Sequence, residues 1–323
     1  MKRAGLICIY FLFISCEQNE IAIEKHPMGE IEESQISMGS NYSKQIFYNA
    51  STNMVVSNNL KTDWDLAFET SENGAQIIIN SSTFSQISEL TNHMFDDPVP
   101  VSIEDLTWQW DSPEGIYYST AFGVTPSSNT YILDRGYNLD GTLRGYRKIK
   151  IDSVNSTAFF ITCANLDNSG LQNFEVKKDS RYNYQYLSFN DNSILNIEPP
   201  KDDWDLVFTQ YTHLFVDNIE TPAYLVTGVL INYLNNVMVA KDTVNSFDAI
   251  TVDIINTYSF SNYQDAIGYN WKEYNFQSQA YTVNTDITYI LKDVSDRYFK
   301  MRFIDFYNDN GIKGYPKFEI QEL

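Results

Sequence analysis

The chain has 323 residues, which is long enough for two domains of ordinary size. Its content of 43% hydrophobic and 15% aromatic residues is too apolar for a globally disordered protein. The formal net charge of −20 argues against nucleic acid as a partner and against docking on an anionic membrane surface, because phosphates and acidic headgroups would be repelled.

Residues 1–15 are predicted to be a signal peptide. Two basic residues are followed by an apolar run at 4–14 that is too short to span a bilayer. The run ends in Leu-Phe-Ile-Ser-Cys, and a small residue directly before Cys16 resembles a bacterial lipobox. Cleavage there would leave Cys16 as the lipid attachment site; a plain signal peptide with an incidental cysteine is the alternative. The acidic segment 16–35 is expected to be a tether.

The elements that follow are predicted to be β-strands. Polar and apolar residues alternate at 146–152, which is typical of a strand with one buried face, and 298–305 repeats the pattern. Further strands are predicted at 45–49, 64–68, 76–79, 184–189, 204–208, 223–231 and 281–291. Asn-Gly and Asp-Gly pairs supply turns. Helical periodicity is weak and predicts one short helix at 85–94, so the fold class is all-β.

One cysteine remains in the predicted mature domains. Cys163 lies in the apolar, strand-like run Ala-Phe-Phe-Ile-Thr-Cys-Ala, whereas Cys8 falls in the signal peptide and Cys16 would carry lipid. No intrachain disulfide is then available. We expect Cys163 to be a buried, inert thiol.

An octapeptide indicates that the chain contains two copies of one fold. KTDWDLAF at 61–68 recurs as KDDWDLVF at 201–208, with six of eight positions identical. The spacing is domain-sized and too long for a solenoid repeat. Trp110 and Trp271 are predicted to be equivalent, as are 131–134 and 289–292. We therefore predict two tandem antiparallel β domains, at 36–169 and 170–323.

These motifs resemble the HmuY family of haem-binding lipoproteins. The resemblance rests on Trp-Asp-Leu-x-Phe and on the closing run from Tyr289-Ile-Leu-Lys to Gly314-Tyr315. It implies an all-β, non-catalytic outer-membrane lipoprotein that binds haem or a related tetrapyrrole for iron acquisition. It also implies haem carrier proteins and an outer-membrane transporter as partners. Whether the domains face the periplasm or the cell surface stays open.

The resemblance implies two axial iron ligands, His or Met, from two loops. In the second copy the corresponding loop at 272–278 carries Tyr274 and Phe276 but neither His nor Met. The segments at 111–115 and 258–268 also lack both residue types. The two-ligand iron site therefore does not carry over position by position.

Few residues remain as candidate ligands of haem iron. His93 and Met94 are both capable of binding iron, although adjacent residues cannot reach opposite faces of one haem. The alternative is that they end a short helix packed on the first copy. His213 is expected to end a strand and face solvent, or else to touch a ligand. His26 lies in the predicted tether.

No catalytic motif was found. The aspartates of the two Trp-Asp pairs are expected to bond turn amides while each Trp buries apolar area. A hydrolase would need a cleft with paired carboxylates of raised pKa, and nothing singles out a pair among the 42 acids. The other alternative is a lipoprotein of this fold that has lost iron ligation and binds another apolar ligand, a glycan or a protein.

Overall fold

The computed structural model describes residues 27–91, 93–97, 99, 102–116, 119–215 and 222–323. The predicted signal peptide at 1–15, Cys16 and His26 lie outside the described residues. The described chain is built almost entirely from antiparallel strands, which confirms the all-β prediction. Its helical elements are short 3-10 turns, and none of those in the described residues has the length and apolarity to cross a bilayer.

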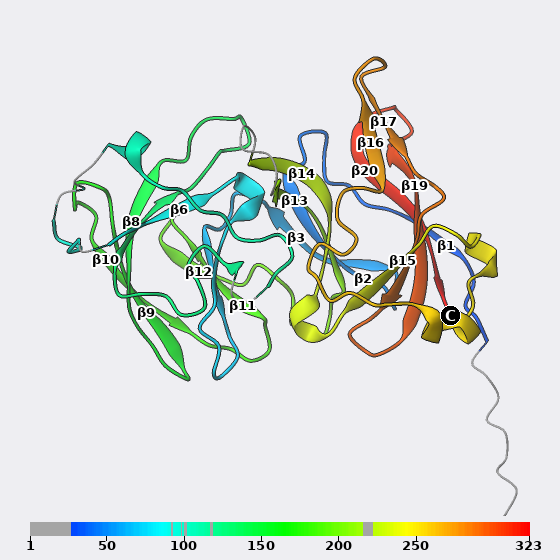
Figure 1. The fold of residues 1–323 in the computed structure, drawn as a ribbon, viewed down its shortest axis with the longest axis horizontal. Helices are drawn as coiled ribbons and strands as arrows, with labels where there is room; N and C mark the ends of the chain where they lie inside the picture. Colours follow the sequence, from blue (N-terminus) through cyan, green and yellow to red (C-terminus); the bar gives the residue numbers. More distant parts are fainter. Residues whose placement is uncertain (1–26, 92, 98, 100–101, 117–118, 216–221) are drawn as a thin grey trace, which may run out of the picture.

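Two five-stranded antiparallel sheets lie at opposite ends of the molecule (Figure 1). The first has the order β10 (Gln172–Lys177), β9 (Ala158–Ala164), β8 (Tyr146–Val154), β7 (Thr130–Asp134), β6 (Gln86–Leu90). The second has the order β1 (Glu32–Gln35), β20 (Lys313–Glu322), β19 (Tyr298–Tyr307), β18 (Thr288–Lys292), β15 (Met238–Asp242). The matching order confirms that β7 and β18 are equivalent.

Two four-stranded sheets lie between them, and a separate hairpin completes the strands. One sheet has the order β12 (Ser193–Leu195), β11 (Tyr184–Ser188), β4 (Leu66–Glu69), β5 (Ile77–Ile79). The other has the order β14 (Ala223–Ile231), β13 (Leu206–Leu214), β2 (Lys44–Asn49), β3 (Met54–Leu60). The hairpin pairs β16 (Lys272–Asn275) with β17 (Ala280–Val283).

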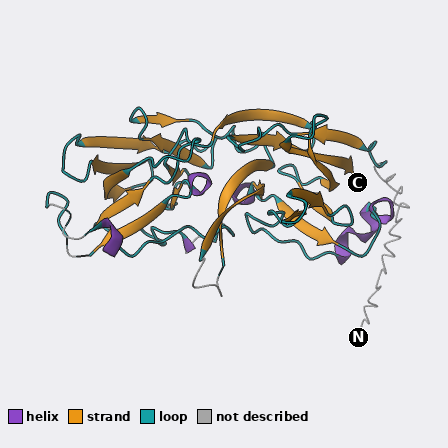
Figure 2. Cartoon of the chain, turned by 90° about the horizontal axis from the view of Figure 1, so that it is seen from above, coloured by secondary structure: helices purple, strands orange, loops and turns teal. Residues whose placement is uncertain are grey.

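The two repeats exchange their first three strands. Strands β10 and β11 of the second repeat pair with β9 and β4 of the first, and β12 follows as the neighbour of β11. Strands β1 and β2 of the first repeat pair with β20 and β13 of the second, and β3 follows as the neighbour of β2. We call β4 to β12 unit I, and β1 to β3 together with β13 to β20 unit II; Figure 2 shows the units side by side. The predicted boundary at 169/170 separates the two repeats in the sequence. It does not separate the sheets, because both units contain strands from either side of it.

The repeated tryptophans lie where the two units meet. Each unit has its own apolar core, and a third buried cluster joins the two four-stranded sheets. In that third cluster the Trp64 ring packs edge-on against Tyr186, with ring centroids 5.0 Å apart. Trp204 packs in the same way against Phe47, also at 5.0 Å. Each Trp thus contacts a strand of the other repeat, so the cluster stabilises the exchanged arrangement.

Three sequence predictions need correction. The helix predicted at 85–94 is wrong, because Gln86–Leu90 forms strand β6 and pairs with β7. The helical periodicity of this segment is weak, so hydrogen bonding to the β7 backbone outweighs its helix propensity. The strand predicted at 281–291 is two strands, β17 and β18, separated by a turn. The last residues of the predicted tether, Glu32–Gln35, form β1 on the edge of the unit II sheet.

Two aspartates bind the exchanged strands. Asp65 Oδ2 accepts the backbone N–H of Phe189 at 2.7 Å, and Asp205 Oδ2 accepts that of Ala50 at 2.7 Å. The prediction that these carboxylates bond turn amides is therefore confirmed. Phe189 and Ala50 are therefore equivalent, and so are Asn192 and Asn53, which both have positive φ in the turns that follow. Upstream of the Trp-Asp pair the spacing between the repeats is thus one residue shorter than at the octapeptide.

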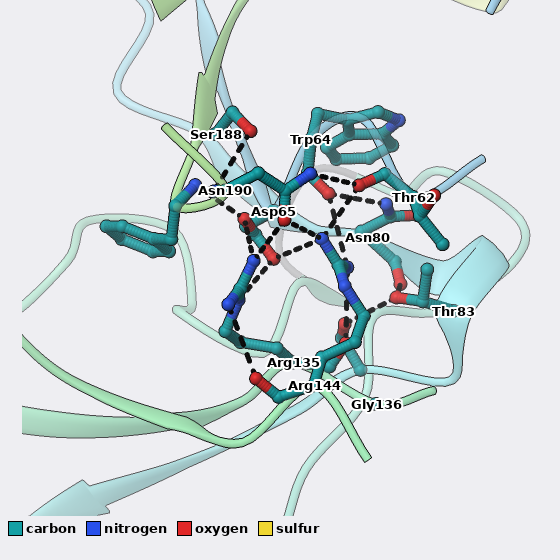
Figure 3. Close-up of polar contacts among 12 residues, drawn as sticks. Thr62, Trp64, Asp65, Asn80, Thr83, Arg135, Gly136, Arg144, Ser188 and Asn190 are labelled. Carbon is teal, nitrogen blue, oxygen red and sulfur yellow. Dashed lines mark hydrogen bonds and ion pairs between the residues drawn. The ribbon is translucent and has the colours of Figure 1, made fainter. Parts of the chain in front are cut away.

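Asp65 has charged partners as well, which sequence reasoning missed. Its carboxylate lies between two buried guanidinium groups, as Figure 3 shows. Arg135 Nε donates to Oδ1 at 2.9 Å, and Arg144 Nη2 lies 3.1 Å from the same oxygen. Arg135 Nη2 also donates to Asn190 Oδ1 at 2.7 Å. Asp65 is therefore paired on all sides, although it is fully buried.

Asp205 lacks such partners. Within the described residues its hydrogen bonds come from backbone N–H groups, those of Ala50 and, at 2.9 Å, of Val294. Asp293, also buried, occupies the position equivalent to that of Arg135. Burial raises the pKa of Asp205 to about 6, because the low-dielectric interior disfavours its charged form.

This difference predicts a pH dependence of stability. The pKa of Asp205 is higher in the folded than in the unfolded chain, so its ionisation opposes folding above about pH 6 and has no such effect below about pH 4. We expect a loss of about 3 kcal/mol in the free energy of unfolding between these limits. Urea denaturation of the wild type and of Asp205→Asn across this range would test it. A pH dependence that persists unchanged in the variant would contradict the assignment.

Candidate functional site

The structure places His93 and Met94 on the segment after β6. The Met94 side chain is 71% exposed, whereas Nε2 of His93 is buried without a hydrogen-bond partner among the described atoms. The next residues are held by Lys148, whose Nζ donates to the carbonyl of Asp97 at 3.1 Å. The two side chains therefore do not share one environment. Their role as haem ligands stays a prediction.

His213 lies near the end of β13 and is half-buried. Its imidazole packs edge-on between the rings of Phe215 and Tyr269, at 5.0 Å from each. Tyr224, directly across in β14, is 59% exposed. His213 thus belongs to an aromatic group at this end of the sheet and does not point freely into solvent.

The hairpin β16–β17 projects from unit II (Figure 1). Tyr274 on β16 pairs across with Tyr281 on β17, and their ring centroids are 5.0 Å apart. Phe276, at the turn, is 85% exposed and lies 5.1 Å from Tyr274, which is 41% exposed. Two exposed rings in contact on a projecting hairpin form a candidate contact surface.

The exposed rings continue into the core of unit II. Tyr281 contacts Phe306 with ring centroids 5.0 Å apart, and Phe306 contacts Trp271 at 5.6 Å. Trp271 in turn stacks on Phe303 at 4.0 Å. We call Phe303, Trp271, Phe306, Tyr281, Tyr274 and Phe276 the aromatic ladder. Because its inner members are fully buried, the ladder holds the hairpin in a fixed orientation.

Lys272 fixes the base of the hairpin. Its ammonium donates to the carbonyl of Thr227 on β14 and lies 4.2 Å from the Trp271 ring centroid and 4.8 Å from that of Phe306. Burial lowers the pKa of Lys272 to about 7. The favourable contacts with aromatic faces offset part of the cost of burying this charge.

A small cavity lies in the central cluster between the units. Its volume is about 90 Å³, whereas drug-sized ligands occupy pockets of roughly 300–1,000 Å³. Two of its lining carboxyls, Asp111 and Glu198, have pKa values raised to about 7 by burial. Backbone N–H groups bind both: those of Ile79 and Ala121 bind Asp111, and that of Tyr184 binds Glu198. The cavity is therefore too small for a tetrapyrrole, and its acids serve to bind buried backbone.

No cluster of three or more His, Cys, Asp or Glu side chains that could hold a metal ion occurs among the residues the structure describes. Cys163 is free and buried, as predicted, and burial raises the pKa of its thiol well above the usual range. The aromatic ladder is thus the feature of the described chain best suited to contact a ligand.

Comparison with known proteins identifies the second half of the chain. Residues 180–320 match the family model described as HmuY protein. This segment is HmuY-like. The HmuY-like segment spans strands β11 to β20 and contains His213, the hairpin and the whole aromatic ladder. His93 and Met94 lie outside it. No curated protein matches the chain.

Solved structures also superpose on most of the chain. Apo PinO from Porphyromonas gingivitis is 9% identical with a TM-score of 0.29, covering 91% of this chain and 97% of its own. The apo HmuY analog (TFO) from Tannerella forsythia is 10% identical with a TM-score of 0.27, covering 92% and 98%.

Sequence reasoning found the hairpin only through the resemblance. A local signal was nevertheless present, because aromatic residues stand two positions apart at Tyr274 and Phe276 and Tyr281 follows after a short turn. Alternating aromatics on a hairpin share one face of it. The buried lysine at its base gave no such signal, since lysines are rarely buried.

Proposed function

We propose that the chain is a non-catalytic binding lipoprotein that holds haem or a related tetrapyrrole against the β16–β17 hairpin. The exposed rings of Tyr274 and Phe276 carry this proposal, because a flat conjugated macrocycle stacks well on aromatic faces. The ladder behind them keeps the hairpin in place before the ligand arrives, which reduces the entropic cost of binding.

The residues present fit stacking better than double axial ligation. The hairpin between Lys272 and Val283 contains no His or Met. Tyr274 offers a phenol oxygen, and tyrosine is an established haem ligand in other proteins. In the proposed complex, Phe276 supports the face of the macrocycle, Tyr274 supplies the oxygen nearest to iron, and haem supplies the iron that is carried.

The proposal includes attachment to the outer membrane by lipid at Cys16. The lipobox-like sequence at 12–16 supports this attachment. Haem carrier proteins and an outer-membrane transporter are proposed as partners, in keeping with the family resemblance. Such a chain receives its ligand, holds it and passes it on, without any chemical step.

Haem titration followed by absorbance tests the site. We expect a Soret shift in the wild type, with affinity reduced about tenfold or more in Phe276→Ala and Tyr274→Ala, as for the loss of an aromatic contact worth at least about 1.4 kcal/mol. Tyr137→Ala is the matched control, since Tyr137 is 44% exposed but lies in unit I. Loss of the shift in His93→Ala or Met94→Ala alone would move the site to the segment after β6.

A second candidate is a protein of the same fold that binds another flat or apolar ligand, a glycan or a protein without coordinating iron. The lack of His and Met on the hairpin favours it. Protoporphyrin IX without iron distinguishes the two, because quenching of its fluorescence would report ring stacking alone. Binding of the free porphyrin without any haem Soret shift would indicate a related tetrapyrrole that is held by stacking alone. Absence of both signals would contradict tetrapyrrole binding and support the second candidate.

A further inference from the structure

Strand β3 is a long edge strand without charge or proline, although a bulge interrupts its pairing with β2 at Val56. It is the last strand of its sheet and pairs only with β2 among the described strands. Its sequence, Met-Val-Val-Ser-Asn-Asn-Leu, contains no charged residue and no proline. Met54, Val55, Val56 and Leu60 are between 41% and 61% exposed. Met54 and Val55 are consecutive and both exposed, so both faces are open where the strand begins.

Such an edge is unusual. Natural sheets blunt their edges with charges, prolines, bulges or very short strands, because unpaired backbone groups recruit other strands. The equivalent edge strand in unit I follows this rule: β12 has only three residues, and Pro199 and Pro200 come soon after it. A seven-residue edge without any charged residue, kept in only one of the two repeats, indicates a use for that edge.

Acidic groups lie at both ends of β3. Asn53, directly before the strand, donates from Nδ2 to Glu32 Oε2 at 2.5 Å. At the other end, the Leu60 N–H binds Asp63 Oδ2 at 2.9 Å. Beyond it, Asp63 and Asp191 line an open groove of about 480 Å³ next to Asn59. Lys44 lies opposite Leu60 on β2, one strand away from the edge.

We propose that β3 is a docking edge for an extended segment of a partner protein, apolar in its middle and basic at its ends. The segment adds to the sheet as a further strand, and main-chain hydrogen bonds hold it. Its apolar side chains cover Val55 and Val56. Its basic ends meet Glu32 at one end, and Asp63 with Asp191 at the other. This surface is separate from the aromatic ladder, so binding here does not depend on the ligand of the hairpin.

Charge argues against a second copy of this chain as the occupant. Antiparallel pairing of two β3 strands places the start of one beside the end of the other. Glu32 of one copy would then approach Asp63 of its partner, and each chain also carries a net charge of −20. A foreign strand with basic ends meets no such repulsion.

Fluorescence anisotropy of labelled peptides on the full chain tests the proposal. The probe is Lys-Val-Thr-Val-Thr-Val-Lys, and the control peptide has glutamate at both ends. We expect the lysine-ended peptide to bind about tenfold or more tightly than the glutamate-ended one. Val56→Lys and Val55→Lys should each weaken binding about tenfold, because a charge on the edge opposes strand addition. Ile194→Lys on β12 is the matched control and should leave binding unchanged.

Three outcomes would overturn the proposal. The first is no anisotropy change with the lysine-ended peptide at about 1 mM protein, the weak limit of specific binding. The second is equal binding of both peptides, or binding that neither valine variant reduces. The third is a dimer in sedimentation that Val56→Lys abolishes, which would assign the edge to a second copy of the chain. Thermal unfolding of each variant confirms that the fold is kept.

Discussion

Replacing Asp65 by asparagine is expected to lower the free energy of unfolding by about 3–5 kcal/mol. The change leaves Arg135 and Arg144 buried without the carboxylate that neutralises them, and both are less than 10% exposed. A buried charge that has lost its partner costs more than the pair contributes when intact. Urea denaturation near neutral pH measures the loss, and circular dichroism shows whether the variant still folds.

Asp205→Asn is the matched control. Asp205 occupies the same position in the other repeat and binds an exchanged strand in the same way, but no described arginine forms an ion pair with it. Near pH 8 the asparagine also removes the cost of an ionised carboxyl whose pKa is raised to about 6, so we expect a change within about 1 kcal/mol. Equal losses in the two variants would refute the role of the arginines.

The aspartate comparison can be extended by removing the arginines. A double change of Asp65→Asn with Arg144→Met removes one of the two orphaned charges and should recover part of the stability. Arg144→Met alone leaves Asp65 paired with Arg135, so its cost should be the smallest of the set. If the stability losses of Asp65→Asn and Arg144→Met do not add up to that of the double variant, the charge pairing and not the packing of these side chains is the source of the effect.

The strands were predictable because their signals are local. Alternation at 146–152 and 298–305 predicted β8 and β19, and the apolar run at 223–231 predicted β14 with the bounds it has. The strand exchange was not predictable in this way. The alternation of polar and apolar residues is the same whether a strand pairs within its own repeat or with the other repeat, because the two partner surfaces are copies of each other. Specific contacts, such as those that Asp65 and Trp64 make with the other repeat, tell the two arrangements apart.

Buried charges were missed for a related reason. Lys148 and Lys300 stand in alternating strands where lysine predicts an exposed face, yet both are almost completely buried. Lys300 Nζ donates to the carbonyls of Phe247 and Ile250, at 2.7 and 3.0 Å, and so fixes the loop that covers the sheet. Such roles depend on loops distant in sequence. They have no local pattern, and the same holds for Arg135 and Arg144.

The sequence named His93 and Met94 as candidate ligands, which stays a prediction, and it did not reveal how the aromatic residues of the hairpin pack. The resemblance indicated the segment 272–278, and the structure shows Tyr274 and Phe276 exposed there at the end of a chain of packed rings. What the local sequence could not supply is the continuity with Trp271 and Phe303, because their contacts arise from the packing of β19 against the hairpin base. That continuity is what makes the hairpin a rigid surface.

Because the repeats exchange strands, the two units are expected to unfold together. Each unit lacks a complete four-stranded sheet without the other repeat, and the central cluster with Trp64 and Trp204 joins them. We expect Trp64→Ala to cost about 3–5 kcal/mol, the usual range for deleting a buried Trp, and to destabilise β8 in unit I and β19 in unit II equally. Trp204→Ala should behave alike.

Hydrogen exchange in increasing urea, read by mass spectrometry on peptides from β8 and β19, measures this cooperativity. In the wild type both peptides should lose protection in one transition, and in either Trp variant both should shift by the same amount. Tyr224→Ala, which removes an exposed ring, is the control and should shift neither by more than about 0.5 kcal/mol. Strand exchange makes each unit depend on segments of both repeats, so a Trp variant should destabilise both. A variant in which β8 is destabilised while β19 keeps its wild-type midpoint would show instead that the units unfold separately.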